Sequence, residues 1–396
     1  MKPKILTLTG DVMLGRLIDQ LLPHPVPNAP PSERNLIPHL RLQHAHLKNY
    51  TPSSPWGTAL PLLLHESDLT LINLETAVTN TSSPWPNKVF NYRASPENAC
   101  AVLRAACVDY AGLANNHAAD FGETGLEESV WAVRERAGVA SAGAGRDPAE
   151  PAVLRFPRLA SAGGGGGGEK MKQGEEGGEG LTIHVYAASD HPTAWANLPT
   201  FHFIDYSAET RVRLKTLLTG SFPFPSSGEQ PQQQAQPDIK IFSVHWGPNY
   251  TWQPASEIQH LAHFLIDECG VDIVHGHSAH HVQGVEVHKG KPIIYGCGDF
   301  VDDYAVDRRF RNDLGGVWRV VFKEGDEGDE VGRARKSRLV MDRVEVFPTK
   351  CELFQVNMLD PGEEDHEWVV ETIGRLSGEL GTKVRSGERG QVVVEL

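Results

Sequence analysis

The chain has 396 residues, enough for two or three domains or for one large α/β domain with insertions. Its 51 acidic and 37 basic residues give a formal net charge of −14. This charge disfavours nonspecific binding to nucleic acid or to an anionic membrane, because such binding needs basic patches. An anionic substrate is not excluded, since a bound metal ion inverts the local charge.

The cysteines and the N-terminal residues indicate the cellular compartment in which the protein is expected. The five cysteines are widely spaced and form no Cys-x-x-Cys motif, which favours a reducing environment. The first residues lead into an apolar strand pattern rather than a signal segment, and no apolar run approaches the ~18 residues of a membrane helix. We therefore expect a cytoplasmic protein without a membrane anchor. The 18 histidines are an unusually large number, and histidine serves as metal ligand and as acid or base.

Strand and helix patterns alternate along the chain. Apolar runs predict strands over residues 5–9, 69–73, 110–113, 181–187, 239–245, 273–275, 284–288, 292–295, 317–322 and 339–347. Amphipathic segments predict helices over residues 96–107, 125–137, 208–218, 256–268 and 365–376, with Ser95 as the N-cap of the first. This alternation indicates an α/β fold, and the short connections after residue 284 favour antiparallel pairing there.

Two segments have the composition of disordered insertions. Residues 161–180 are rich in Gly and Glu, and residues 222–237 are rich in Pro and Gln, so neither can bury an apolar core. We expect one domain over residues 1–350 that contains both insertions. The remaining residues, 351–396, are expected to form an extension whose helix packs on the same domain.

Polar side chains follow most of the predicted strands, where an α/β sheet binds its ligands. A lone histidine or carboxylate after a strand is usually a structural or surface residue. Repetition at six strand ends is hard to attribute to chance, and oxygen and imidazole donors from separate strands suit a pair of divalent metal ions. The segments concerned are residues 10–16, 73–76, 114–120, 245–247, 275–281 and 296–300.

These segments carry motifs that resemble a known family. In chain order they read Gly-Asp-x-Met-Leu-Gly-Arg, Asn-Leu-Glu-Thr, Asn-Asn-His-x-x-Asp-x-Gly-x-x-Gly, His-Trp-Gly-x-x-Tyr and Gly-His-x-x-His. The series is similar to the CapA-type capsule synthesis family, also called the poly-γ-glutamate biosynthesis family, which itself resembles the calcineurin-like metallophosphoesterases. The resemblance spans residues 5–302. It implies an αββα four-layer sandwich with a dinuclear metal centre.

The resemblance also implies a set of metal ligands. Asp11 matches the first carboxylate of the superfamily, although a capping role in a turn is the alternative. Glu75 takes the position of a bridging carboxylate, where the superfamily has Asp. The other implied ligands are Asn116, His245, His277 and His280, and the two ions would be Mn, Fe or Zn. Three neighbours fall off the matched ligand positions and are expected to be structural or supporting residues: His275, His281 and Asp299.

The same match implies a catalytic role for one histidine, and three basic residues are candidates for binding the substrate because of their charge. His117 corresponds to a proton or hydrogen-bond donor to the reacting group, and Asp120 is placed to orient it, with an N-cap of the next helix as the alternative. Arg16, Lys88 and Arg93 are candidate anion-binding residues, because arginine and lysine pair with phosphate or carboxylate. For each of these three, the alternative is a solvated surface charge.

Two functions remain open at this point. The leading hypothesis is a metal-dependent hydrolase that acts on a phosphoester, or else an amide, of an anionic small molecule or polymer. The alternative is a non-catalytic component that binds or assembles an anionic poly-γ-glutamate-type polymer, as the family name suggests. The completeness of the motif series disfavours a structural protein with a degraded site.

Overall fold

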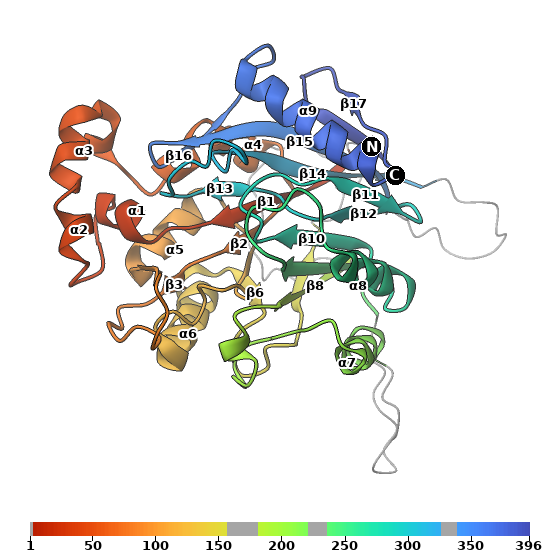
Figure 1. Cartoon of the computed structure of the whole chain (residues 1–396), viewed down its shortest axis with the longest axis horizontal. Coiled ribbons are helices and arrows are strands. Elements are labelled where there is room, and N and C mark those ends of the chain that lie inside the picture. Colours follow the sequence, from red (N-terminus) through yellow and green to blue (C-terminus); the bar gives the residue numbers. More distant parts are fainter. Residues whose placement is uncertain (1–2, 157–180, 221–235, 326–338) are drawn as a thin grey trace, which may run out of the picture.

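Figure 1 shows a computed structural model of the chain, which describes residues 3–156, 181–220, 236–325 and 339–396. The described residues form a mixed α/β structure with one ten-stranded sheet, one six-stranded sheet and a two-stranded ribbon. The α/β class predicted from the sequence is therefore confirmed. The predicted insertion at residues 161–180 lies outside the described residues, as does 222–237 apart from its last two positions.

The ten-stranded sheet has a parallel half and an antiparallel half. Its order is β17-β18-β15-β14-β1-β2-β5-β6, with β13 beside β1 and β16 beside β15. Strands β1, β2, β5 and β6 run parallel, whereas β14, β15 and β18 continue the sheet from β1 in antiparallel fashion. The strands are β1 (Lys4–Val12), β2 (Leu69–Leu74), β5 (Tyr110–Gly112), β6 (Ala140–Ala142), β13 (Asp299–Val301), β14 (Leu314–Glu324), β15 (Leu339–Glu352), β16 (Gln355–Met358), β17 (Arg385–Ser386) and β18 (Val392–Glu395).

The six-stranded sheet has the order β11-β12-β10-β9-β8-β7. Its strands are β7 (Ala152–Arg155), β8 (Thr182–Ser189), β9 (Ile239–His245), β10 (Ile273–His277), β11 (Val285–His288) and β12 (Lys291–Ile294). The predicted antiparallel pairing after residue 284 is right for β11 with β12 but wrong for β12 with β10, which is parallel. Strands β3 (Ala77–Val78) and β4 (Arg93–Ala94) form the small ribbon.

The two large sheets share one apolar core. That core contains Leu71 of β2 and Ile241 of β9, both fully buried. A second core lies under helices α7 (Ala208–Thr219) and α8 (Ser256–Asp267), which cover the other face of the six-stranded sheet (Figure 1). The apolar stripe predicted for α8 is buried there, as the 3.6-residue period requires.

Helices α5 (Pro96–Ala105) and α6 (Gly122–Trp131) contribute to the shared core on the side of the ten-stranded sheet. Ser95 caps α5 as predicted, because its side chain accepts a hydrogen bond from the backbone N–H of Asn98. Four short helices near the N-terminus were not predicted: α1 (Arg16–Leu21), α2 (Pro31–Arg34), α3 (Ile37–Gln43) and α4 (Leu60–His65).

The C-terminal residues pack on the same sheets. The predicted boundary between residues 350 and 351 falls inside β15, and β18 pairs with that strand. Helix α9 (Glu364–Glu379) contacts β15, β14, β18 and also β11 of the other sheet. Among the helices that the structure describes, none is both long and apolar enough to cross a membrane.

Strand β1 positions the first motif differently from the sequence prediction. It continues through Val12 instead of ending at residue 9, and its pairing with β2 shifts register between Leu8 and Asp11. A register shift of this kind changes the direction in which a side chain points near the end of a pair of hydrogen-bonded strands. Asp11 then lies level with Asn73 of β2 and Asp299 of β13, while His277 of β10 lies level with His245 of β9. Parallel pairing thus places the polar residues at the predicted strand ends next to one another.

Candidate metal centre

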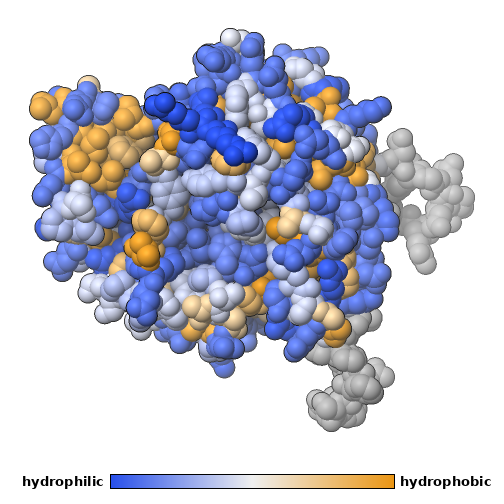
Figure 2. All heavy atoms as spheres, viewed as in Figure 1, coloured by the Kyte–Doolittle hydropathy of each residue, from blue (hydrophilic) through white to orange (hydrophobic). Residues whose placement is uncertain are grey.

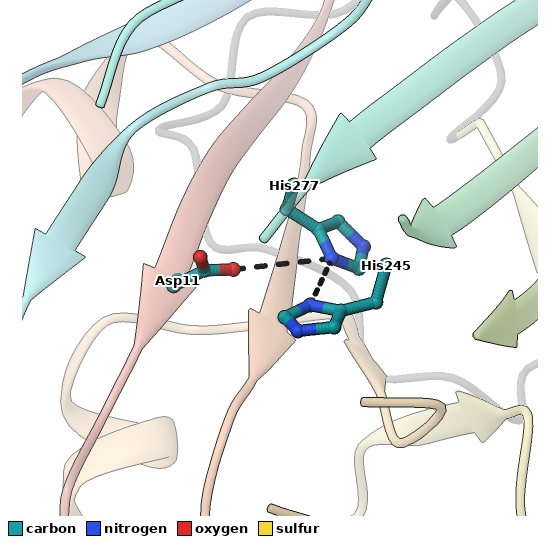
Figure 3. Close-up of side chains that lie close together, drawn as sticks. All are labelled: Asp11, His245 and His277. Atoms are coloured by element: carbon teal, nitrogen blue, oxygen red, sulfur yellow. Dashed lines mark hydrogen bonds and ion pairs between the residues drawn. The ribbon is translucent and has the colours of Figure 1, made fainter. Parts of the chain in front are cut away.

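Three side chains from both sheets converge at the end of the shared core (Figure 3). Asp11 comes from β1, His245 from β9 and His277 from β10, and all three are buried. The Nδ1 atoms of the two histidines lie 2.9 Å apart, and His277 Nδ1 lies 3.9 Å from Asp11 Oδ1. Ligand atoms of the three residues all lie within 4.8 Å of one another, which is close enough for the three to hold one metal ion together.

A second group shares Asp11 with the first. It consists of Asp11, His280 and Asp299, whose ligand atoms also lie within 4.8 Å of one another. His280 Nδ1 lies 2.7 Å from Asp299 Oδ1 and 3.6 Å from the other Asp11 oxygen, Oδ2. Two adjoining groups with one shared carboxylate are an arrangement suited to two metal ions.

Glu75 lies between the histidines and is fully buried. Its Oε1 atom is 4.0 Å from His280 Nε2 and 3.9 Å from His117 Nε2, and its Oε2 atom is 4.0 Å from His245 Nδ1. Within the described residues, no N–H or O–H group donates a hydrogen bond to either oxygen. A buried carboxylate without donors is costly unless a proton or a cation neutralises it.

The charges at the centre are strongly perturbed. Burial raises the pKa of Glu75 and of Asp299 well above their ordinary values, and the nearby Asp11 carboxylate adds to both effects. Burial also raises the pKa of Asp11, although His280 opposes the shift. The same desolvation lowers the pKa of His245 and of His277 well below the usual value, so both are neutral and offer lone pairs.

Hydrogen bonds orient several of these groups. Ser243 Oγ lies 3.1 Å from His277 Nε2, which leaves the Nδ1 atom facing Asp11. Asn73 donates to Asp11 Oδ1 over 2.7 Å, and Asn115 donates to the amide oxygen of Asn73 over 3.1 Å. Partners of this kind fix ligand orientation in metal sites. Asn73 was not singled out by the sequence analysis, although it occupies the motif position just before Leu74.

Asn116 and the two other clustered histidines complete the predicted set. Asn116 Oδ1 is buried and has no hydrogen-bond partner within the described residues, as a ligand oxygen would. His275 is fixed at both ring nitrogens, by Ser243 Oγ at 3.2 Å and by the Thr9 carbonyl at 2.8 Å. His281 lies beside Trp252 and Phe310 instead.

His117 and Asp120 form a hydrogen-bonded pair beside the centre. His117 Nδ1 lies 2.6 Å from Asp120 Oδ2, so the Nε2 atom faces Glu75. Asp120 also accepts hydrogen bonds from the Tyr92 backbone N–H and from Lys88 Nζ. It does not cap α6, whose N-cap position is Phe121 without a side-chain bond. Burial lowers the pKa of His117 to about 4 even though Asp120 opposes the shift.

The predicted anion-binding residues differ in their surroundings. Lys88 Nζ lies 3.1 Å from His117 Nδ1, at the edge of the centre. Arg16 lies over the Tyr92 ring, 5.2 Å from its centroid, and Tyr92 stacks on His117 at 4.2 Å. The Arg93 guanidinium instead donates to the backbone carbonyl oxygens of Pro27, Asn80 and Thr81, so it links two segments of backbone.

A pocket of about 550 Å³ adjoins this side of the centre. Arg16, Tyr92 and Arg93 line it together with apolar side chains such as Leu36 and Phe90. In Figure 2, apolar surface gathers over the neighbouring α3, where Leu42 is 78% exposed. The pocket volume falls in the range of about 300–1,000 Å³ that is usual for small-molecule sites.

Sequence reasoning missed Asp190 and His191, which follow β8 directly. The His191 ring lies 5.0 Å from the His245 ring, and Asp190 accepts hydrogen bonds from the Tyr206 hydroxyl and the Gly247 N–H. The strand-end rule that found the other candidates applies here too, because residues 181–187 were predicted as a strand.

Fold and site together define a class: a mixed α/β protein with a buried cluster of histidines and carboxylates at the ends of parallel strands. The family model of the bacterial capsule synthesis protein PGA_cap matches residues 5–304. The chain therefore belongs to this family, as the motif series indicated.

Two relatives cover much of the chain. A protein of Mycobacterium tuberculosis named "Probable polyglutamine synthesis accessory protein" is 33% identical over 406 residues, covering 96% of this chain and 94% of that protein. The "Capsule biosynthesis protein CapA" of Bacillus anthracis is 22% identical over 301 residues, covering 75% of this chain and 59% of that protein. A solved structure titled "GAP50 the anchor in the inner membrane complex of Plasmodium" matches with a TM-score of 0.32 and 9% identity, over 67% of this chain and 82% of that one.

Proposed function

We propose that the protein is a hydrolase that depends on two divalent metal ions and acts on a phosphoester of an anionic substrate. We also propose that its two packed sheets form the αββα sandwich of the metallophosphoesterase type. Glu75 carries the proposal: it is a fully buried carboxylate without a donor, and three histidines lie 3.9–4.0 Å from it. Buried carboxylates and neutral histidines packed this closely are more stable with a pair of bound cations than without them.

The residues around Glu75 fit a dinuclear centre. Asp11, which belongs to both ligand groups, and Glu75, which three histidines surround, would help to hold the ions. The remaining ligands would be Asn116, His245, His277 and His280, with Asp299 holding His280 in place. Mn, Fe and Zn all accept such mixed nitrogen and oxygen ligands. When bound, the ions supply Lewis acidity and neutralise negative charge that develops on the substrate.

The chain's own residues supply proton transfer and orientation. His117 directs Nε2 toward Glu75 while Asp120 holds Nδ1, so His117 is placed to exchange a proton with the leaving group. Lys88 is placed to attract the anionic substrate to this edge. Arg16 and the adjoining pocket would hold the rest of the substrate. Arg93 shapes that pocket through its bonds to backbone carbonyls.

Metal content and hydrolysis test the proposal together. The purified chain, reloaded with Mn²⁺ or Zn²⁺, should hydrolyse a generic phosphodiester such as bis-p-nitrophenyl phosphate. The double variant His245→Ala, His277→Ala should lose both bound metal and activity, because it removes two ligands of one group. The variant His65→Ala, which changes a histidine outside the site, should keep both. Wild-type protein that takes up no Mn, Fe or Zn would contradict the proposal.

Asp120→Asn tests the role of His117 without changing a proposed ligand. An amide cannot accept as strongly from the His117 N–H, so the ring loses its fixed tautomer. Since general acid–base catalysis contributes roughly 10²–10⁴-fold, we expect phosphodiester hydrolysis to fall by about 10–100-fold. Metal content should be unchanged. Asp360→Asn at an exposed position is the matched control, and equal activity in the two variants would remove Asp120 from the mechanism.

The names of the relatives favour a second candidate function. Both the mycobacterial and the Bacillus anthracis names place those proteins in polymer or capsule synthesis, one of them as an accessory protein. The alternative is therefore a cytoplasmic component that binds or assembles a poly-γ-glutamate-type polymer without cleaving it. Equilibrium binding of poly-γ-glutamate by metal-loaded protein that hydrolyses no ester would support this alternative against the hydrolase.

A further inference from the structure

A second group of metal-ligating side chains lies away from the centre just described. His263 of α8 and Glu286 and His288 of β11 offer ligand atoms within 4.8 Å of one another. Glu286 pairs with Ile293 of β12, which pairs with Val274 near the start of β10. The proposed centre lies at the other end of β10, at His277. The second group also lies under α8, on the face of the six-stranded sheet that faces away from the shared core.

The sequence spacing brings these side chains together. His263 and Asp267 are four residues apart on α8 and therefore share one helical face. Glu286 and His288 are two residues apart on β11 and therefore point to one face of the sheet. Where the helix face meets the strand face, four potential ligand or supporting side chains oppose one another.

Local contacts already hold this group in register. His263 Nε2 lies 2.7 Å from Glu286 Oε1, and the His263 and His288 rings stack with centroids 4.1 Å apart. Tyr295 donates its hydroxyl to the other Glu286 oxygen over 2.6 Å, and Asp267 Oδ1 lies 2.9 Å from His288 Nε2. Tyr295 and Asp267 thus orient a carboxylate and an imidazole, as supporting residues do in metal sites.

We propose that His263, Glu286 and His288 bind a single borderline divalent cation of the Zn²⁺ type. Two imidazoles and one carboxylate are a ligand set that zinc accepts, with water in the remaining position. The histidine side chains are 32% and 20% exposed, which gives them room to turn from the stacked arrangement toward one ion. Because β11 is an edge strand, the ion clamps that edge to α8. The proposal is independent of the hydrolase proposed above.

Zinc counting on the full chain tests this site. Protein stripped with a chelator and reloaded with Zn²⁺ should lose about one zinc ion per chain in the double variant His263→Ala, His288→Ala, because both imidazole ligands are gone. His260→Ala removes a histidine from the same helix outside the ligand group and should keep the full count. Glu286→Gln, which keeps the shape of the side chain, should also lose about one ion and serves if the double variant fails to fold.

Thermal unfolding gives a second readout that does not depend on activity. Added Zn²⁺ should raise the Tm of a triple variant, His245→Ala, His277→Ala, His280→Ala, which lacks a histidine ligand in both groups of the proposed centre. The rise should be smaller once His288→Ala is added. An equal zinc count in wild type and Glu286→Gln, together with an unchanged Tm response, would show that the group is a hydrogen-bonded network and no metal site.

Discussion

Glu75→Gln should abolish most hydrolysis while leaving the fold intact. Glutamine has the same shape but no charge, so the centre loses the carboxylate that three histidines surround. We expect metal content to fall and phosphodiester hydrolysis to drop by about 10²–10³-fold, the size seen when one preorganised electrostatic group is removed. Glu127→Gln on the exposed face of α6 is the control and should match wild type.

The thermal stability of the metal-free proteins shows whether Glu75→Gln loses activity because it unfolds. Burial raises the pKa of Glu75 in the folded state, so the unfolded chain loses its proton from this group at lower pH than the folded chain does. The metal-free wild type should therefore lose stability as pH rises past the ordinary glutamate value of about 4.3. Metal-free Glu75→Gln lacks that loss and should have the higher Tm at neutral pH. If metal-free Glu75→Gln instead has a lower Tm than metal-free wild type at neutral pH, Glu75 stabilises the fold directly, which contradicts its proposed role as a metal ligand.

Gly10→Ala should damage both the fold and the centre. A Cβ atom at residue 10 would lie 1.6 Å from the Gly298 carbonyl oxygen, and that atom belongs to backbone that cannot simply rotate away. The next residue is Asp11, whose N–H donates to the same carbonyl. We expect a loss of about 1–3 kcal/mol or more in unfolding free energy, with reduced metal uptake, because β1 must move from β13.

Gly378→Ala is the matched control for this prediction. It lies on α9 with no atom within 4 Å of an added Cβ, so alanine should be neutral or stabilising by up to about 1 kcal/mol. Urea unfolding of both variants measures the difference. If Gly10→Ala unfolds at the wild-type midpoint with full metal content, the close approach of β1 to residue 298 does not position the centre.

Much of the fold was predictable from the spacing of apolar residues along the sequence and from the composition of each segment. The ten predicted strands all correspond to strands of the structure, because most of them are short segments in which apolar residues run together or alternate with polar ones. The helices α1 to α4 were missed because they are only four to seven residues long, and such helices depend on tertiary contacts rather than on propensity. Strand β13 has only three residues and forms through its pairing with β1.

The site was predictable only where a motif marks a strand end. Asp11, Glu75, His245, His277 and His280 lie together as the motif order suggested, although their role as ligands stays a prediction. Tyr92 stacks on His117 across 25 residues of sequence, and no local pattern indicates that contact. The environment of Arg93 was not predictable either, because its hydrogen bonds to the carbonyl oxygens of Pro27, Asn80 and Thr81 form only when the loops fold together.

Anomalous diffraction from crystals of the Mn²⁺-loaded protein is the most direct test of the central claim. The account predicts two peaks about 3.5–4 Å apart, one on each side of the Glu75 carboxylate, within reach of Asp11 and of the histidines at 245, 277 and 280. Crystals grown at saturating Mn²⁺ with no peak within bonding distance of Glu75 would contradict it.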